Sequence, residues 1–234
     1  MSSLPLTSRA LAALALGALT LTALPAWAES HDHDHDHEHA HDEAHEHDHG
    51  HAHDTDSKRI YSGYFTDEEI QPRPLSDWYG DWQSVYPFLQ DGTLAPVMAA
   101  KAQTGDKTAE EYTAYYDTGY ATDVDRIEIT GNSFTFHGPE GAVTADYVNN
   151  GYEVLTYAKG NRGVRYIFRK VDGDEAAPGY VQFSDHAVSP TDAGHYHLYW
   201  GDDRAALLEE VTNWPTYYPA DLSGDEIVEE MLAH

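Results

Sequence analysis

Short strand-like runs fill the second half of the sequence, and they limit the folds open to it. From residue 125 on, β-branched and aromatic residues recur in brief segments, several of them separated by Gly131-Asn132, Asn150-Gly151 or Gly160-Asn161. Sequential short strands at near-regular spacing predict an antiparallel meander that closes into a β-barrel. The predicted strands are Arg126–Thr130, Ser133–His137, Ala142–Tyr147, Tyr152–Lys159, Gly163–Val171, Tyr180–His186 and His195–Trp200.

Helical patterns flank these strands, so the predicted fold class is mainly β with flanking helices. Ser223 is placed to N-cap the last helix, with Glu226 three residues on in a capping-box arrangement. A tyrosine stripe in the second helix indicates packing rather than a cofactor site. The predicted helices are Leu89–Ala102, Thr108–Tyr120, Asp203–Asn213 and Asp221–Leu232.

Three histidines are concentrated within twelve positions, at His186, His195 and His197. A spacing of two directs His195 and His197 to the same face of a strand. The intervening segment carries Pro190, Asp192 and Gly194 and therefore predicts a turn. If the two arms pair antiparallel, His186 lies opposite His195, and three imidazoles converge on one point. Three histidines with an open fourth position suit zinc.

The alternative for a His-x-His pair is two half-exposed polar residues on a strand. The third histidine and a histidine-rich segment near the start of the chain favour metal binding instead. That segment, residues 29–59, alternates histidine with aspartate and glutamate at eleven positions from His31 to His53. It contains nothing that builds a core, so we expect it to be disordered and to capture several ions weakly.

The start of the chain has the pattern of a secretory signal peptide. Arg9 precedes an apolar run, and Ala26-Trp27-Ala28 forms a small-x-small cleavage site. We therefore predict three parts: a signal peptide at residues 1–28, the histidine-rich tail at 29–59 and a folded domain at 60–234. No other segment is apolar enough to cross a bilayer, so the exported protein is not expected to insert in a membrane.

Composition narrows the chemistry further. The chain has no cysteine, so a zinc site must use His, Asp or Glu, and no disulfide can form. The formal net charge is −28, or −28 − 1 = −29 once Arg9 is removed with the signal peptide. Nucleic-acid binding is disfavoured because phosphates would be repelled, whereas cations would be attracted.

Longer motifs resemble the ZinT (YodA) family from about Phe65 to the end of the chain. The Gly80-x-Trp82 pair is also similar to the motif that opens the first strand of lipocalin-like barrels. One departure is that some members carry a cysteine pair, where this chain has Ala145 and Lys170 or a neighbour. The motifs are Leu75–Trp78, Gly80, Trp82–Pro87, Gly119–Asp123, Gly163–Tyr166, Gln182–His186, His195, His197, Asn213–Pro219, Glu229–Met231 and His234.

The resemblance implies a calycin-type, lipocalin-like antiparallel β-barrel in the bacterial periplasm. It also implies that zinc, or cadmium, is bound by three histidines that match His186, His195 and His197. The family is associated with zinc scarcity and with the periplasmic solute-binding component of a zinc ABC importer, which is the expected partner. The resemblance therefore predicts a zinc-binding protein that captures the ion and passes it on, not an enzyme.

Two other functions remain open from the sequence. A zinc-dependent hydrolase or hydratase would also use three histidines and a bound water, with Asp185 or Glu153 as a candidate general base. A lipocalin-type carrier of an apolar ligand is suggested by the barrel alone. His137 is expected to be solvated at the end of a strand, and His234 is a candidate ligand of a second, weaker site.

Overall fold

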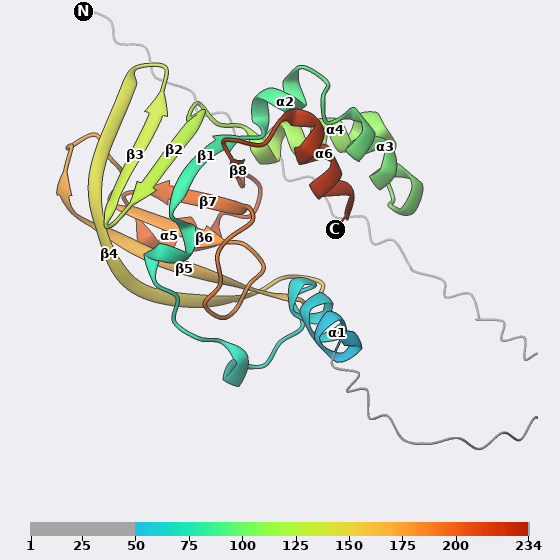
Figure 1. Cartoon of the computed structure of the whole chain (residues 1–234), viewed down its shortest axis with the longest axis horizontal. Helices are drawn as coiled ribbons and strands as arrows, with labels where there is room; N and C mark the ends of the chain where they lie inside the picture. Colours follow the sequence, from blue (N-terminus) through green and yellow to red (C-terminus); the bar gives the residue numbers. More distant parts are fainter. Residues whose placement is uncertain (1–49, 234) are drawn as a thin grey trace, which may run out of the picture. The chain divides into compact units, whose positions relative to one another are not determined.

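The computed structural model describes residues 50–233, with side chains from Asp56 on. Within them, antiparallel strands form a closed barrel in which each pairs with the next and β8 returns to β1 (Figure 1). The predicted lipocalin-like barrel with flanking helices is confirmed. The strands are β1 Gly80–Ser84, β2 Arg126–Thr130, β3 Ser133–Gly138, β4 Gly141–Thr156, β5 Arg162–Gly173, β6 Tyr180–Ser184, β7 Tyr196–Gly201 and β8 Thr216–Pro219.

Alternating apolar residues fill the barrel with aromatic rings. Trp78 is fully buried, and its ring stacks on Phe183 with the centroids 4.4 Å apart. Trp82 of β1 is 3% exposed, and its indole N–H donates to the Trp78 carbonyl at 2.9 Å. Its ring also meets the edge of Tyr196 from β7. Because a buried indole N–H needs an acceptor, this bond fixes the first strand on the segment that precedes it.

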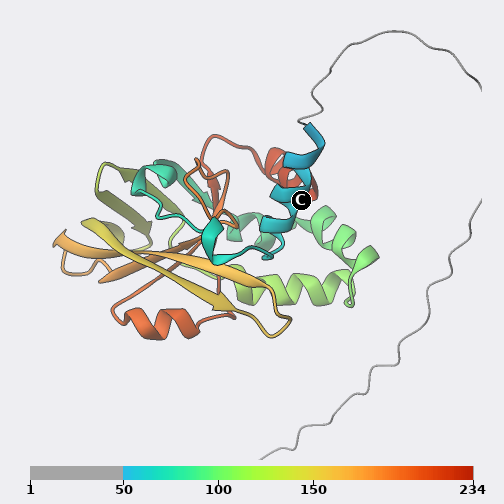
Figure 2. The ribbon, with the colours of Figure 1, turned by 90° about the horizontal axis from the view of Figure 1, so that it is seen from below.

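The long strand β4 differs from the prediction of two separate strands. Asn150-Gly151 was expected to be a turn, but β4 continues through it while pairing with β5 (Figures 1 and 2). The register shifts between Asn149 and Tyr152, and Gly151 has φ +84°. An Asn-Gly pair in a strand pattern can mark a β-bulge as well as a turn, and the pairing of β4 with β5 decides between them.

Strand β8 was not predicted, although it closes the barrel between β7 and β1. It is four residues long and ends at a proline, so it carries too little alternation to be recognised. Its partners come from distant parts of the sequence: Tyr217 pairs with Ser84 of β1 and with Tyr196 of β7. The closure therefore depends on long-range pairing that a local pattern cannot reveal.

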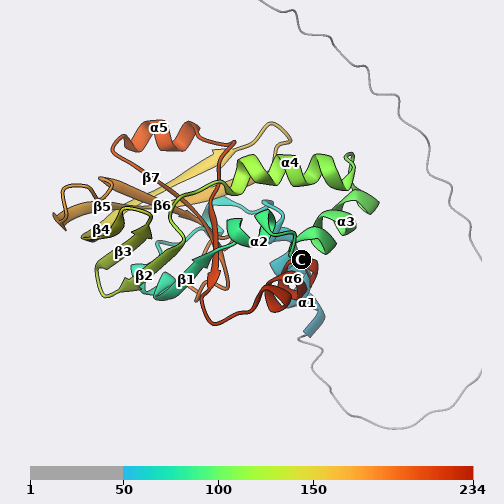
Figure 3. The ribbon, with the colours of Figure 1, turned by 90° about the horizontal axis from the view of Figure 1, so that it is seen from above.

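Helices gather mainly at one end of the barrel, with α5 apart from the others on its outside (Figures 2 and 3). Four of them pack around a second apolar cluster that includes Val97, Met98, Tyr120 and Ile227. No helix within residues 50–233 has the length and hydropathy needed to cross a bilayer. The helices are α1 Gly50–Tyr61, α2 Tyr86–Gln90, α3 Ala95–Thr104, α4 Ala109–Tyr120, α5 Arg204–Glu209 and α6 Gly224–Ala233.

Helix boundaries match the predictions at some ends and not at others. The Ser223–Glu226 capping box is present: the Glu226 N–H donates to Ser223 Oγ at 3.3 Å, and the Ser223 N–H donates to Glu226 Oε2 at 2.8 Å. The predicted helix Leu89–Ala102 is instead split into α2 and α3, with Gly92 at φ +86° between them. Helix α5 is shorter than predicted, since its C-cap Glu210 is extended.

Helix α1 begins inside the segment that the composition marks as tail. It starts at Gly50, and Arg59 in its last turn pairs with Glu69 at 2.5 Å beyond the following loop. This ion pair connects the end of α1 to the folded domain. The predicted signal peptide, residues 29–49 of the tail and His234 lie outside the described residues.

Some family members carry a cysteine pair where this chain has Ala145 and Lys170, and these two residues make other contacts. Ala145 of β4 lies opposite Gly173 in the β4–β5 register, whereas Lys170 lies opposite Tyr147. The Lys170 ammonium donates to three carbonyls of the β5–β6 connection, those of Asp174, Glu175 and Ala177. A charged side chain thus anchors this connection through its hydrogen bonds.

Candidate metal centre

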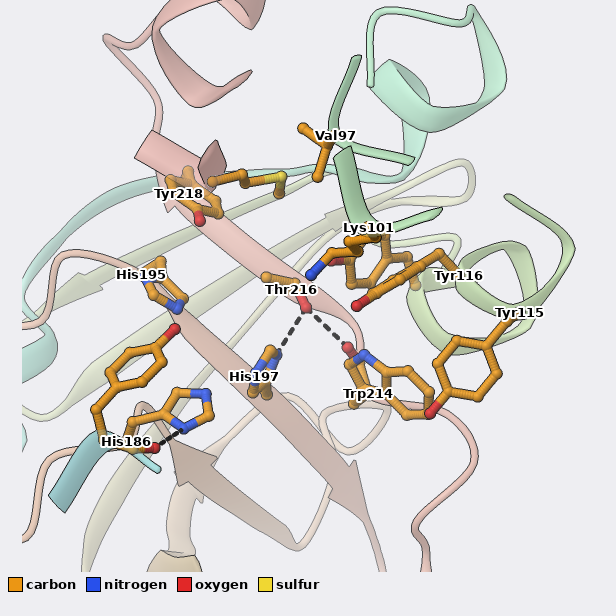
Figure 4. A pocket seen from close by; sticks show the side chains of 13 residues that line it. Val97, Lys101, Tyr115, Tyr116, His186, His195, His197, Trp214, Thr216 and Tyr218 are labelled. Carbon is orange, nitrogen blue, oxygen red and sulfur yellow. Dashed lines mark hydrogen bonds between the residues drawn. The ribbon is translucent and has the colours of Figure 1, made fainter. Parts of the chain in front are cut away.

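Three histidines from two neighbouring chain segments face one another at the helix-covered end of the barrel (Figure 4). His197 lies on β7, and Ser184 of β6 is its partner across the ladder. The β6–β7 ladder ends at this pair, and His186 and His195 lie just beyond the strands, so the predicted pairing of His186 opposite His195 is not part of the ladder. The ring centroids are 5.6 Å apart for His186–His197, 6.1 Å for His195–His197 and 6.2 Å for His186–His195.

These separations can be compared with those of a zinc site. With zinc–nitrogen bonds of about 2.0–2.1 Å, three imidazoles on a tetrahedral ion have centroids roughly 5 to 5.5 Å apart. The observed triangle is slightly wider. Within residues 50–233, no three His, Cys, Asp or Glu side chains are already arranged to hold an ion. The three rings therefore lie close to the separations of a zinc site without forming one in this conformation.

His197 is oriented by strand β8. Its Nδ1 lies 2.7 Å from the Thr216 hydroxyl, which itself donates to the Trp214 carbonyl at 2.9 Å. Because the hydroxyl hydrogen is committed to that carbonyl, Thr216 accepts the hydrogen on His197 Nδ1. The other ring nitrogen, Nε2, is then unprotonated and available to a metal, the arrangement typical of ligating histidines.

His186 is oriented by the end of helix α1. Its Nδ1 lies 3.2 Å from the Tyr61 carbonyl, and its ring stacks on the Tyr61 ring with a centroid distance of 4.3 Å. A carbonyl only accepts, so His186 Nδ1 carries the hydrogen and Nε2 has the lone pair that a metal requires. His186 also has φ +65°, the one positive φ among described residues other than glycine. Such a conformation is retained only where surrounding contacts enforce it.

The loop that carries His186 is anchored by a buried ion pair. Both oxygens of Asp185 accept from Arg73 Nη1, at 2.6 and 2.7 Å, and Asp185 also accepts from Trp78 Nε1 at 3.1 Å. The Arg73 Nε donates to Asp77 at 2.8 Å, and its Nη2 donates to the Thr191 carbonyl. Arg73 therefore holds the loop at both ends.

The histidines line a cavity of about 360 Å³ whose walls are mainly aromatic. His195 stacks on Tyr218 of β8, with centroids 5.0 Å apart and planes 9° from parallel. Among the residues that the structure describes, no aspartate or glutamate lines the cavity. The lining residues are Tyr61, Val97, Lys101, Tyr115, Tyr116, Tyr120, His186, His195, His197, Trp214, Thr216, Tyr218 and Met231.

Burial keeps His197 in the form that binds metal. Desolvation lowers the pKa of His197 well below its usual value, and the neighbouring His186, His195 and buried Arg165 lower it further. The Arg165 guanidinium donates to the carbonyls of Leu207 and Glu210. A neutral imidazole is the ligating species, so these surroundings favour metal binding over protonation.

The ZinT family profile, described as "ZinT (YodA) periplasmic lipocalin-like zinc-recruitment", matches residues 56–234. The chain belongs to the ZinT family. The probable metal-binding protein YrpE of Bacillus subtilis (strain 168) is 56% identical over 182 residues, which cover 77% of this chain and 72% of YrpE. The zinc-binding protein AdcA of Streptococcus pyogenes serotype M1 is 52% identical over 183 residues, which cover 76% of this chain but 36% of AdcA.

A solved structure agrees with these relationships. The Zn(II)-bound ZinT-like domain of Streptococcus pneumoniae AdcA matches with a TM-score of 0.72 at 49% identity, covering 74% of this chain and 97% of that one. The chain thus corresponds to one domain, about a third of the length, of full AdcA. ZinT is described as a zinc-recruitment family and the relatives are named metal-binding proteins, so the chain is not an enzyme.

The bases considered for an enzyme have other roles in this ZinT protein. The Asp185 side chain is 3% exposed and is occupied by Arg73 and Trp78. Glu153 pairs with Arg204 at 2.8 Å. Neither lines the cavity. His137 also lies outside it, on β3 beside Glu128 and 35% exposed, so it is half-buried rather than freely solvated.

Sequence reasoning missed the residues that contact the histidines. Each lies 19 or more residues from its histidine: Thr216 contacts His197, Tyr61 contacts His186, and Tyr218 contacts His195. It also missed Lys101, which lines the cavity. The Asn213–Pro219 motif was a signal for Thr216 and Tyr218, but a motif alone does not say which side chain meets which ligand. Tyr61 and Lys101 had no signal of their own.

Removing the Thr216 hydroxyl tests its proposed role toward His197. We expect Thr216→Val to weaken zinc binding about 10- to 100-fold, the usual effect of losing a partner that orients a ligating histidine. Thr135→Val on β3 is the matched control, since Thr135 contacts Thr144 outside the cavity. Zinc affinity is measured by competition with a chromophoric chelator. Equal affinities for the two variants would contradict the role.

The buried His197 also predicts how the metal-free protein responds to acid. Unfolded histidine protonates near pH 6.5, whereas the lowered pKa keeps folded His197 neutral there. Below pH 6.5 the unfolded chain thus binds more protons, and the free energy of unfolding decreases until pH reaches the folded pKa. We expect His197→Gln to flatten this decrease in urea unfolding between pH 7.5 and 5.5, and the control His137→Gln to retain it. Parallel curves for wild type and His197→Gln would refute the account.

Proposed function

We propose that this protein recruits zinc in the periplasm, holds it with His186, His195 and His197, and passes it to the solute-binding component of a zinc ABC importer. The observation that carries the proposal is the triangle of imidazoles in one cavity, two of which present Nε2 because Nδ1 is engaged. Membership of a zinc-recruitment family supports zinc as the ion. Cadmium, which prefers similar ligands, is expected to compete.

The donor set favours an ion that is held but can be released. Three neutral nitrogens leave the fourth position of a tetrahedral ion open, and an incoming ligand can attack the metal there. The chain contains no cysteine, so no thiolate adds a stronger bond. Such a site suits a protein that delivers zinc rather than one that stores it permanently.

Three features support delivery in the periplasm. The predicted signal peptide would export the chain, and the family is described as periplasmic. The histidine-rich tail would raise the local supply of ions, since a tethered ligand acts at high effective concentration. Helix α1 connects the tail to Tyr61, which contacts His186 directly.

The streptococcal relatives support coupling to an importer component. In AdcA, named a zinc-binding protein, the matching domain is joined to a longer remainder of the same chain. We infer that the present protein hands its ion to a separate polypeptide. The ion would pass through the open fourth position, where a ligand of the acceptor can bind before the histidines release.

The ligand assignment predicts the number of tightly bound ions. A form lacking residues 29–49 should bind one zinc tightly, and His195→Ala should lose it while the circular dichroism spectrum stays unchanged. His137→Ala, which removes an imidazole outside the cavity, should bind as wild type does. The measurement is equilibrium dialysis with metal analysis. Retention of the tight ion by His195→Ala would remove this histidine from the ligand set.

Handover predicts a transfer rate that depends on the acceptor. We expect zinc to reach the solute-binding component faster than it dissociates into buffer, with a rate that rises with acceptor concentration in stopped-flow measurements. Removal of residues 29–49 should lower the number of ions carried and slow loading at scarce zinc, but leave transfer from the cavity unchanged. A rate that saturates at the spontaneous off-rate would show release through solution instead.

A further inference from the structure

The cavity that holds the three histidines continues onto helices α3 and α4, and a single lysine lies in that extension. Lys101 of α3 points into the cavity on the side of Thr216 and His197 (Figure 4). We propose that the cavity binds a small organic carboxylate together with zinc, the carboxylate occupying the open coordination position and pairing with Lys101. This proposal rests on zinc binding by the histidines, and it adds the class of molecule that accompanies the ion.

The first argument is charge. The whole chain is strongly acidic, yet none of the described residues that line this cavity is a carboxylate. None of the ion pairs among the described residues includes Lys101, whose ammonium lies 5.4 Å from the centre of the Tyr116 ring. With three neutral imidazoles as ligands, zinc keeps its double charge. Zinc and the described lining residues together then carry three positive charges and no negative one.

The coordination chemistry selects an oxygen anion. Zinc accepts a carboxylate oxygen at about 2.0–2.2 Å, and its tetrahedral shell has one position left after three histidines. A carboxylate also accepts charge-assisted hydrogen bonds from an ammonium group, which are stronger than neutral ones. One carboxylate can therefore offset part of the positive charge of the metal and of Lys101, whereas a water molecule in the fourth position offsets none of it.

The walls select an organic molecule rather than an inorganic ion. Tyr115, Tyr116 and Trp214 face the cavity beyond the lysine, and Val97 and Met231 add aliphatic surface. A volume of about 360 Å³ equals the liquid volume of about twelve waters, at roughly 30 Å³ each. That space suits a small ligand with an apolar or aromatic body, in keeping with the predominantly apolar lining of small-molecule pockets.

Phenylacetate is a suitable probe because it combines one carboxylate with one aromatic ring and does not chelate zinc. We expect saturating phenylacetate to raise the zinc affinity of the full-length protein about tenfold, the effect of one charge-assisted contact. By linkage, zinc must raise the affinity for phenylacetate by the same factor. Acetate should give a smaller effect, since it leaves the aromatic walls uncovered. Affinities are measured by chelator competition, with tryptophan fluorescence as a second signal.

Lys101→Met tests the lysine, because methionine keeps much of the length of the side chain and removes its charge. We expect it to bind zinc alone at least as tightly as wild type and to lose most of the phenylacetate effect. Lys159→Met is the matched control, an exposed lysine outside the cavity, and should retain the effect. Zinc binding by Lys101→Met also shows that the variant is folded.

The outcomes separate this proposal from the proposed function. Loss of tight zinc binding from wild type in every buffer would refute the histidine site itself. Tight zinc binding that phenylacetate does not change would leave that site intact and overturn the carboxylate proposal. An equal effect from sodium sulfate at matched ionic strength would also overturn it, since that result requires only a general anion. A phenylacetate effect retained in Lys101→Met would remove the lysine and with it the proposed pairing.

Discussion

The buried guanidinium of Arg73 is the interaction on which the metal-site end of the barrel depends. It is fully enclosed, lies 4.2 Å from the centre of the Trp78 ring, and pairs with both Asp77 and Asp185. Removing one partner of a buried ion pair typically costs about 3–5 kcal/mol, because an uncompensated charge remains. Since Asp185 precedes His186 directly, this ion pair also determines where the metal-site loop leaves β6. Stability and the position of a ligand thus have the same physical source.

Each of the three histidines in the candidate centre is oriented by a neighbouring residue. His197 is oriented through Thr216 of β8, His186 through the Tyr61 carbonyl of α1, and His195 through stacking on Tyr218. Strand β8 supplies two of these contacts, so the strand that closes the barrel also aligns the imidazoles. Because hydrogen bonds at Nδ1 leave Nε2 as the donor atom, the arrangement prepares neutral nitrogens before any ion arrives.

The tail and the cavity differ in the charged groups that they contain. The tail has many carboxylates and imidazoles in its sequence, whereas the described lining of the cavity has imidazoles and Lys101 but no carboxylate. The described lining of the cavity offsets little of the charge of a bound metal, which is why we propose a further anionic ligand there.

The sequence by itself determined the barrel and the capping box at Ser223, because alternation, turn residues and capping are local patterns. It did not determine whether Asn150-Gly151 would be a turn or a bulge, nor that Thr216–Pro219 would close the barrel, because both depend on pairing with distant strands. It also left Asp185 open as a candidate base. Only the tertiary structure joined Asp185 to Arg73, 112 residues away, and His186 to Tyr61. Hydrogen bonds and ring contacts of that range are decided when the segments pack, and no spacing along the chain encodes them.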